Sequence, residues 1–260
     1  MKNRKVVYTA LTGGYDGLLQ PSCIDPSYDY ICFSNDFDQK NIGIWKIEKI
    51  PFETMDIQRL SRFPKLQPNR FLKEYDFSIY IDANIDIATN YVYERAEQLY
   101  EKGIKLAGIK HQLRKCLYRE SLEVILRGVE KNRKKVILQM KEYIKIGFPF
   151  NFGMYEANVI YRMHNDTQVI EQCNIWWYWQ QNYSRRDQLS YSFSLWKAKV
   201  PFSYLLLENE WTKNSKDLVF HRHPQKSGFW KKLIIHIWEQ FILPFLVPIL
   251  FPLYKIYLKH

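Results

Sequence analysis

Two carboxylates and an amide follow one short apolar segment in the first third of the sequence. Asp82, Asn84 and Asp86 alternate with apolar residues at the end of residues 77–84, a run that predicts a strand. Because residues two apart on a strand share a face, their oxygens are expected to point the same way. Hard divalent cations take oxygen ligands of this kind. The segment is therefore a candidate Mn2+ or Mg2+ site, and an ordinary turn is the alternative.

A second candidate site lies at the end of a strand predicted over residues 5–12. The chain continues from Thr12 into Gly13 and Gly14, where the backbone can approach a ligand closely. Ligands of open α/β sheets bind at the carboxyl ends of strands. The glycine spacing matches neither a dinucleotide-binding fingerprint nor a P-loop. A ligand-binding loop and a plain glycine turn both remain open.

Three basic residues, Arg59, Arg62 and Lys65, follow one another at intervals of three. They fall in a helix predicted around residues 56–72, which its two prolines must break or end. The spacing places three cations on roughly one helical face. Such a face either clamps a diphosphate or is exposed to solvent.

Asp187 is preceded by Arg185 and Arg186 and begins a helix predicted over residues 186–197. A carboxylate is favoured at a helix N-terminus, and its basic neighbours keep it ionised. An ionised carboxylate can act as a general base that removes the proton from an attacking hydroxyl, and Asp187 is the best candidate for that role. A helix cap paired with arginine is the alternative.

The elements that must position these residues alternate between strand and helix. Further strands are predicted over residues 28–34, 45–50, 106–111 and 153–163, and helices over residues 91–102 and 117–146, the latter as two helices that meet near Asn132. With 260 residues, this pattern predicts one large α/β domain.

The composition is that of a globular protein, with 47% apolar and 25% charged residues, which excludes disordered, collagen-like and polytopic membrane proteins. A net charge of +11 favours anionic partners such as phosphates or an acidic membrane. No nucleic-acid-binding motif is present, so no nucleic-acid partner is expected. The apolar run at the N-terminus is too short for a signal peptide, and we expect a cytoplasmic protein.

Residues 228–260 differ in composition from residues 1–227, which are expected to form the catalytic domain. No charged residue occurs from Phe241 to Tyr254, and lysines lie on both sides, at positions 231, 232, 255 and 259. The uncharged run is short of the roughly 20 residues that span a bilayer, and its three prolines are expected to interrupt a helix. We expect an amphipathic anchor lying on the inner face of the cell membrane. A spanning anchor and a segment packed on its own domain are the alternatives.

Several segments, taken in order, resemble the glycosyltransferase-like family of the plant TOD1 and MUCI70 proteins and their bacterial relatives. They are residues 8–16, 59–65 with Pro68, 79–84, 111–120 and 184–190, within roughly residues 5–225. The resemblance implies a GT-A-like fold, a single mixed, mostly parallel sheet flanked by helices, with a nucleotide-binding and an acceptor-binding half. Asp82 stands where such enzymes carry a D-x-D metal motif, although Asn84 replaces the second carboxylate.

The resemblance also implies roles for individual residues. Donor binding is expected from Thr9, Ala10, Thr12, Tyr15, Asp16, Arg59, Arg62, Lys65, Asp82, Ala83 and Asn84. The metal would be held by Asp82 and Asn84 with a late histidine, His221 or His223. On the side of the sugar or acceptor we expect His111, Arg114, Arg186 and Gln188, with packing at the sheet edge as the alternative for the first two.

The expected activity is transfer of a sugar from a nucleoside diphosphate donor, most simply a UDP-sugar, to a surface glycan or a lipid-linked acceptor. A divalent cation, Mn2+ or Mg2+, would neutralise the departing diphosphate. Inversion and retention both remain open. The alternative function is a catalytically silent membrane-surface module with the same fold, which metal-dependent UDP binding would distinguish from an enzyme.

Overall fold

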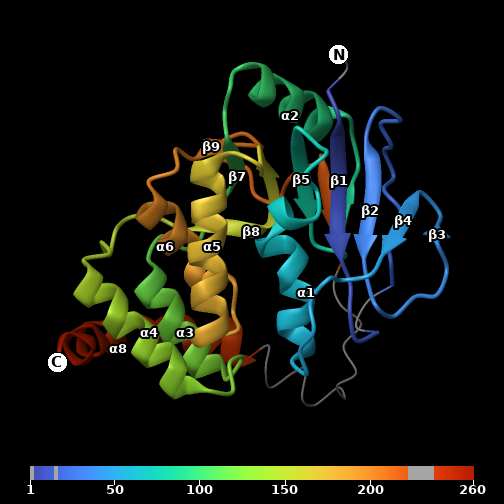
Figure 1. Ribbon diagram of the computed structural model, residues 1–260. Coiled ribbons are helices and arrows are strands. Elements are labelled where there is room, and N and C mark those ends of the chain that lie inside the picture. The colour runs from blue at the N-terminus through green and yellow to red at the C-terminus, as the bar shows by residue number, and fades with distance from the viewer. Residues whose placement is uncertain (1–2, 15–16, 222–236) are drawn as a thin grey trace.

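An eight-stranded sheet forms the centre of the structure, a computed structural model that describes residues 3–14, 17–221 and 237–260 (Figure 1). The strands lie in the order β3 (Asn41–Ile42), β4 (Trp45–Glu48), β2 (Asp29–Phe33), β1 (Lys5–Ala10), β5 (Phe77–Ile81), β8 (Tyr155–Arg162), β7 (Leu106–Lys110) and β9 (Ser203–Tyr204). Strands β4, β2, β1 and β5 are parallel, so their carboxyl ends meet at one edge. Strand β8 runs antiparallel to both neighbours. The predicted mixed, mostly parallel sheet of a GT-A-like fold is confirmed.

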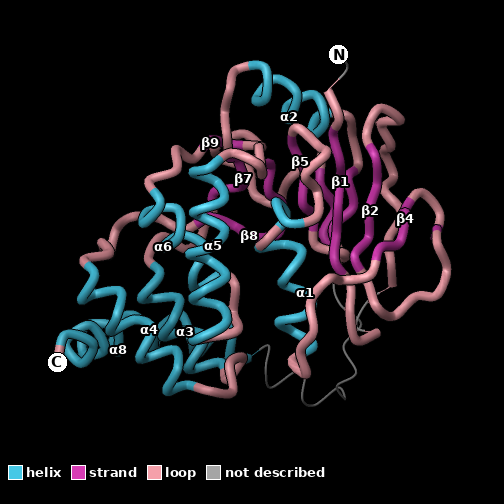
Figure 2. Tube along the Cα trace, in the orientation of Figure 1, coloured by secondary structure: helices cyan, strands magenta, loops and turns pink. Residues whose placement is uncertain are grey.

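Helices cover both faces of the sheet (Figures 1 and 2). On one face lie α1 (Ile57–Leu66), α5 (Thr167–Asn182) and α6 (Gln188–Ala198), packed on alternate residues of β1 that include Val6 and Tyr8. On the other face α2 (Tyr91–Glu101) packs on Val7 and Ile79. Successive side chains of β1 thus point alternately into two hydrophobic layers, one on each face of the sheet.

Three further helices form a group beside the sheet: α3 (Leu117–Arg127), α4 (Arg133–Ile146) and α8 (Leu243–Lys259). A short 3-10 turn, η1 (Pro68–Arg70), follows α1, and a π-helical turn, η2 (Trp238–Ile242), precedes α8. A second, two-stranded sheet pairs β6 (Ile85–Ile87) antiparallel with β10 (Leu218–Phe220).

Most predicted boundaries hold to within a few residues, because capping residues mark them. Asn132 caps α4 by accepting from the backbone of Lys135, so the helix junction expected near Asn132 is confirmed. Asp56 caps α1 in the same way, and α1 ends at Leu66, ahead of Pro68. Pro64 lies inside α1 and does not end it.

Helix α5 was not predicted. Its buried residues recur at intervals of three and four on one face, but that face includes Gln172 and Gln180, and the exposed face includes Tyr178, so hydropathy does not mark the helical period. One signal was present, since Asp166 accepts from the backbone N–H groups of Gln168 and Val169 as a helix N-cap.

The expectation that prolines interrupt a helix in the tail was wrong. Helix α8 is continuous over 17 residues, with Pro248 and Pro252 inside it and Pro244 in its first turn. All three are exposed and lie four residues apart, so their missing N–H donors fall along one solvent-facing side. Among the described residues, one helix, Gln240–Lys259, is long and apolar enough to cross a membrane. The expected boundary at residues 227 and 228 lies outside the described residues.

Candidate active site

Asp82 lies immediately after β5, at the edge where the parallel strands end. Its backbone N–H donates to the carbonyl of Asn158 across the sheet at 2.8 Å. Its Oδ1 accepts from the hydroxyl of Tyr80 at 2.8 Å and from Nζ of Lys65 at 3.2 Å. The carboxylate is therefore held in one orientation by two donors before any ligand arrives.

Lys65 bridges Asp82 to Asp187. Its side chain is only 1% exposed, and Nζ lies 2.6 Å from Oδ2 of Asp187. Arg162, itself fully buried, donates to the backbone carbonyl of Lys65 at 2.8 Å and so fixes the end of α1. A buried ammonium needs compensating charge, and here two carboxylates provide it. The lysine ties the end of β5 to the start of α6.

Asp187 is the N-cap of α6, and its Oδ1 accepts from the backbone N–H of Gln188. Burial alone raises the pKa of this carboxyl, but the positive charges of Arg62, Lys65 and Arg186 outweigh burial and hold the pKa well below its usual range. Nε of Arg62 lies 3.1 Å from Oδ2. Asp187 is thus an ionised, tightly paired carboxylate. Because a weak base accepts protons poorly, these contacts favour a positioning role over the general-base role expected from the sequence.

The predicted row of cations on α1 does not face solvent. Arg62 and Lys65 both reach Asp187, whereas Arg59 pairs with Asp56 at 3.0 Å and donates to the carbonyl of Gln180. The three side chains are 21%, 26% and 1% exposed for Arg59, Arg62 and Lys65. The alternative of a solvated basic face is wrong, and α1 instead presents two of its cations to the site.

The donor-side candidates at the end of β1 are buried. Thr9 and Ala10 end the strand, and Thr12 donates from Oγ1 to the carbonyl of Ile57 at 3.2 Å, which joins this loop to α1. Tyr15 and Asp16 lie outside the described residues. The end of β1 and the start of α1 therefore form one connected rim of the site.

The glycine loop after Thr12 needs its glycines. Gly13 and Gly14 have φ angles of 78° and 56°, and a Cβ on Gly13 would lie 3.0 Å from the side chain of Ile57. The backbone N–H of Gly14 donates to Asp36 at 3.1 Å. The loop is thus a tight left-handed turn at the sheet edge.

The three oxygen ligands predicted after β5 do not share a face. The chain turns after Asp82, where the N–H of Ile85 donates to the Asp82 carbonyl at 2.9 Å, so the alternation is broken. Asp86 turns instead to Ser22, which donates from its backbone N–H and its hydroxyl. Asp86 is therefore a structural residue and not a metal ligand beside Asp82.

Asn84 and the backbone of His221 lie side by side. The N–H of His221 donates to the Asn84 carbonyl at 2.9 Å, and the side-chain amide of Asn84 donates back to the His221 carbonyl at 3.0 Å. Ala83 lies between Asp82 and Asn84 in the turn and is half-buried. His223 lies outside the described residues.

Within the described residues, no group of three or more His, Cys, Asp or Glu side chains could hold a metal ion on its own. The donors that lie close in the chain are the Asp82 carboxylate and the Asn84 amide, with His221 beside Asn84. Mg2+ is usually bound through one or two carboxylates together with substrate phosphates and water. This donor set fits a cation that arrives with a diphosphate, and it does not form an independent metal site.

On the other side of the sheet edge, His111 follows β7. Its Nδ1 accepts from the backbone N–H of Arg114 at 3.2 Å, and its ring lies against that of Trp211. Burial, followed by the charges of Arg114 and Lys213, lowers the pKa of His111 to about 4. The imidazole is neutral at physiological pH, with its proton on Nε2.

Arg114 donates to Oε1 of Glu120 at 2.6 Å. The carboxylate of Glu120 is buried, and its Oε2 has no hydrogen-bond partner in the described structure. Burial raises the pKa of Glu120 despite the charges of Arg114 and Arg186. Arg186 thus acts on both Glu120 and Asp187, and the structure brings Arg114 and Arg186 to the same region.

Gln188 donates to the carbonyl of Tyr155 at 2.5 Å, which joins α6 to β8. Glu120 and Arg162 were missed as site residues. Each had a signal, since a charged residue on the apolar side of a predicted helix or inside a predicted strand is buried only with a partner. The partners, at Arg114 and at Tyr8, could not be read from the sequence.

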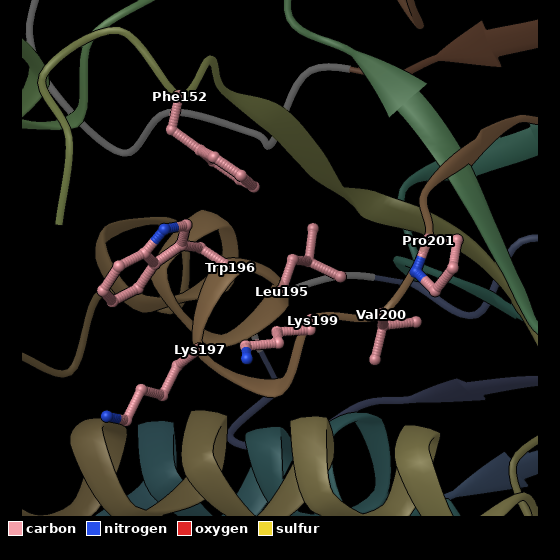
Figure 3. A pocket seen from close by; sticks show the side chains of 7 residues that line it. All are labelled: Phe152, Leu195, Trp196, Lys197, Lys199, Val200 and Pro201. Carbon is pink, nitrogen blue, oxygen red and sulfur yellow. The ribbon is translucent and has the colours of Figure 1, made fainter.

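A cavity of about 440 Å³ lies at the far end of α6 from Asp187, lined by Phe152, Leu195, Trp196, Lys197, Lys199, Val200 and Pro201 (Figure 3). Helix α6 has 11 residues, which corresponds to a length of about 16 Å. None of the predicted site residues lines this cavity. We therefore place the candidate site at the sheet edge around Asp82 and Asp187.

Residues 1–223 match the sequence model described as TOD1/MUCI70, glycosyltransferase-like domain. The chain belongs to this family. The resemblance noted in the sequence is thereby confirmed. The matched region contains all of the candidate site. It ends before α8, so the family model does not include that helix.

The solved structures to which this chain is similar include glycosyltransferases. The galactosyltransferase LgtC, in complex with donor and acceptor sugar analogues, is 11% identical with a TM-score of 0.41, over 77% of this chain and 72% of LgtC. Mouse xyloside xylosyltransferase 1, in its apo form, is 10% identical with a TM-score of 0.45, over 78% of this chain and 84% of its own. No curated protein matches the sequence.

Proposed function

We propose that this protein transfers a sugar from a nucleoside diphosphate donor, most simply a UDP-sugar, to a hydroxyl of a surface glycan or a lipid-linked acceptor. The observation that supports this most directly is the Lys65 bridge between Asp82 and Asp187 at the carboxyl edge of the sheet. In a member of a glycosyltransferase-like family, this is the edge where a nucleotide ligand is expected.

The charge of the site suits a diphosphate. Arg62, Lys65 and Arg186 act together on Asp187, so cations outnumber the two carboxylates Asp82 and Asp187. Arg62 keeps about a quarter of its side chain exposed and can turn toward an incoming phosphate. A planar guanidinium binds phosphate oxygens through two parallel donors.

A divalent cation, when bound, would supply positive charge to the departing diphosphate. Asp82 and the Asn84 amide would hold it, together with His221 or His223. Lys65 already pairs with Asp82, so the negative charge of this site is partly neutralised before a metal binds. Diphosphate binding should therefore depend less on the metal than at a site with two unpaired carboxylates. We expect UDP to bind weakly without metal and more tightly with Mn2+ or Mg2+.

Asp187 holds Lys65 and Arg62 in place for the donor, and His111, Arg114, Arg186 and Gln188 line the side from which the acceptor approaches. This assignment separates two tests of Asp187. If Asp187 positions the cations, Asp187→Asn lowers the rate at every pH and leaves the shape of the pH profile unchanged. If it is a general base, the acidic limb of the profile disappears as well, and the loss is about 10² to 10⁴-fold.

The deciding experiment is a donor panel. The protein is incubated with nucleotide sugars, with and without Mn2+ or Mg2+, and release of the nucleoside diphosphate is measured. Asp82→Asn is compared with Asp86→Asn, a matched change four residues away at a carboxylate that accepts from Ser22 instead. Loss of metal-dependent UDP binding in Asp82→Asn alone supports the proposal. No turnover with any donor, together with no UDP binding, would favour the silent membrane-surface module.

A further inference from the structure

Helix α8 is held against the domain along one face. Leu243, Val247, Tyr254 and Leu258 are buried and belong to the hydrophobic core shared with α3 and α4. The hydroxyls of Tyr254 and Ser121 lie 3.1 Å apart, within hydrogen-bonding distance. The tail is therefore packed on its own domain, and its orientation is fixed by α3 and α4 (Figure 1).

The opposite face of α8 is apolar and exposed. Phe245, Ile249 and Leu253 are 74%, 68% and 64% exposed, and Phe241 and Ile256 extend the same stripe. These positions follow at intervals of three and four, so they line one side of the helix. Contiguous exposed apolar side chains of this kind mark a contact surface rather than ordinary solvent-facing positions.

Lysines border this stripe. Nζ of Lys141 on α4 lies 4.6 Å from the ring centre of exposed Tyr257, and Nζ of Lys255 lies 4.4 Å from the ring centre of Phe150. Lys259 is exposed one turn after Lys255. Helix α4 adds further exposed cations, Arg133, Lys134 and Lys145, in the same helical group. An apolar stripe with a basic border is complementary to the headgroup region of an anionic bilayer.

We propose that α8 lies in the plane of an anionic membrane surface, with the stripe from Phe241 to Ile256 inserted among the lipids and the lysines at the headgroups. The anionic cytoplasmic leaflet of the cell membrane is the surface that fits this charge. In the view of Figure 1, α8 and the edge at which β1 and β2 end lie toward the same side of the molecule. The site then faces lipid-linked acceptors near the bilayer, although the membrane contact itself does not depend on the proposed donor chemistry.

Two observations favour a helix lying on the membrane over one that crosses it, although its length permits crossing. A crossing helix would carry α3 and α4 into the hydrocarbon with it, including the charged side chains of Arg119 and Lys141. Pro248 and Pro252 also lack the N–H groups that would pair with carbonyls one turn earlier. Water and headgroups satisfy those carbonyls at the interface, and hydrocarbon does not.

The test is co-sedimentation of the full chain with vesicles of phosphatidylcholine alone or with 30% phosphatidylglycerol. We expect binding to the anionic vesicles that weakens as salt rises. The triple variant Phe245→Ser, Ile249→Ser, Leu253→Ser changes only exposed side chains and should lose binding while remaining folded. A matched triple variant, Ile24→Ser, Leu207→Ser, Val219→Ser, removes exposed apolar side chains elsewhere and should bind normally. Changing Lys141, Lys255 and Lys259 to Gln should weaken binding about fivefold per lysine at low salt.

Alkaline carbonate extraction distinguishes the two membrane arrangements, because it releases a protein that lies on the surface and leaves a spanning one. Release supports the proposal, and retention overturns it. The proposal is also wrong if the full chain ignores anionic vesicles. A dimer in solution that the exposed-face variant converts to a monomer would then identify a second copy of the chain as the occupant of the stripe.

Discussion

Two carboxylates, partly buried Asp187 at the start of α6 and buried Glu120 in the first turn of α3, each accept a hydrogen bond of 2.6 Å from one basic side chain. Lys65 supplies that bond to Asp187, and Arg114 supplies it to Glu120. The pKa of Asp187 is nevertheless held below its usual range, whereas burial raises the pKa of Glu120.

The difference lies in the second ring of charges. Arg186 acts on both carboxylates, but Asp187 is also in direct contact with a second cation, Arg62, so attraction exceeds the effect of burial. Glu120 is more deeply buried, and Glu123 adds a like charge one turn away. One cation in close contact therefore does not offset the effect of burial on the pKa of Glu120. Asp187 therefore carries a fixed negative charge, whereas Glu120 holds its proton more readily than an ordinary carboxyl.

The largest expected effect comes from removing the cation that Asp82 and Asp187 share. Lys65→Met leaves Asp82 and Asp187 without their shared partner, and we expect the free energy of unfolding to fall by about 3 to 5 kcal/mol at neutral pH. Chemical denaturation measures the loss. Adding Asp187→Asn to this variant should recover part of it, because one unpaired charge is then removed. Unchanged stability in Lys65→Met would show that Arg62 alone compensates for Asp187.

The next largest effect is the loss of folding stability at acid pH. Since the folded pKa of Asp187 lies below that of the unfolded chain, its stabilising contribution is present above about pH 4 and is lost as the pH falls further. One strongly paired carboxylate contributes about 2 to 3 kcal/mol. Asp187→Asn should therefore be less stable than the wild type at pH 6, and this gap should narrow toward pH 2. Equal pH dependence of the two proteins would contradict the depressed pKa.

Glu120 should show the opposite sign and a smaller effect. Its folded pKa lies above the unfolded value, so its contribution is fully present below about pH 4 and is lost as the pH rises through the folded pKa. Glu120→Gln keeps a neutral partner for Arg114, and we expect a change of about 1 kcal/mol or less at neutral pH. Denaturation at pH 4 and pH 8 measures it. The free energy of unfolding of the variant, relative to that of the wild type, should be higher at pH 8 than at pH 4. The reverse order would be inconsistent with a raised pKa of Glu120.

The two carboxylates also differ in how far the sequence revealed them. Asp187 follows two arginines and precedes an apolar helical period, so its capping position was predictable from its neighbours. The pairing of Asp187 with Lys65 was not predictable, because the two residues are 122 positions apart and only the fold brings the end of α1 to the start of α6. Glu120 lies among buried residues of α3, and its partner Arg114 comes from the preceding loop.

Local patterns predicted the strands and the capped helices. They failed where the chain turns and where a helix buries polar side chains. The alternation of Asp82, Asn84 and Asp86 predicted a shared face, yet the turn after Asp82 sends Asp86 to Ser22. Helix α5 buries Gln172 and Gln180 on its inner face and exposes Tyr178 on its outer face, so the hydropathy of its sequence does not follow its buried face. Spacing thus locates the candidate site at the sheet edge, while the pairing of its charges follows from the fold.

The smallest effect tests Arg114, whose charge changes the pKa of both His111 and Glu120. Its charge lowers the pKa of His111, after burial, to about 4, and it opposes the rise of the Glu120 pKa. Arg114→Met should therefore move both pKa values upward, with that of His111 rising by roughly one unit and remaining below 6.5 because burial persists. NMR titration of the imidazole signals follows this directly, with His111→Gln to assign the resonance. An unchanged midpoint would mean that the charge of Arg114 is neutralised by Glu120 before it reaches His111, and a midpoint near 6.5 would mean that charge rather than burial sets the state of this histidine.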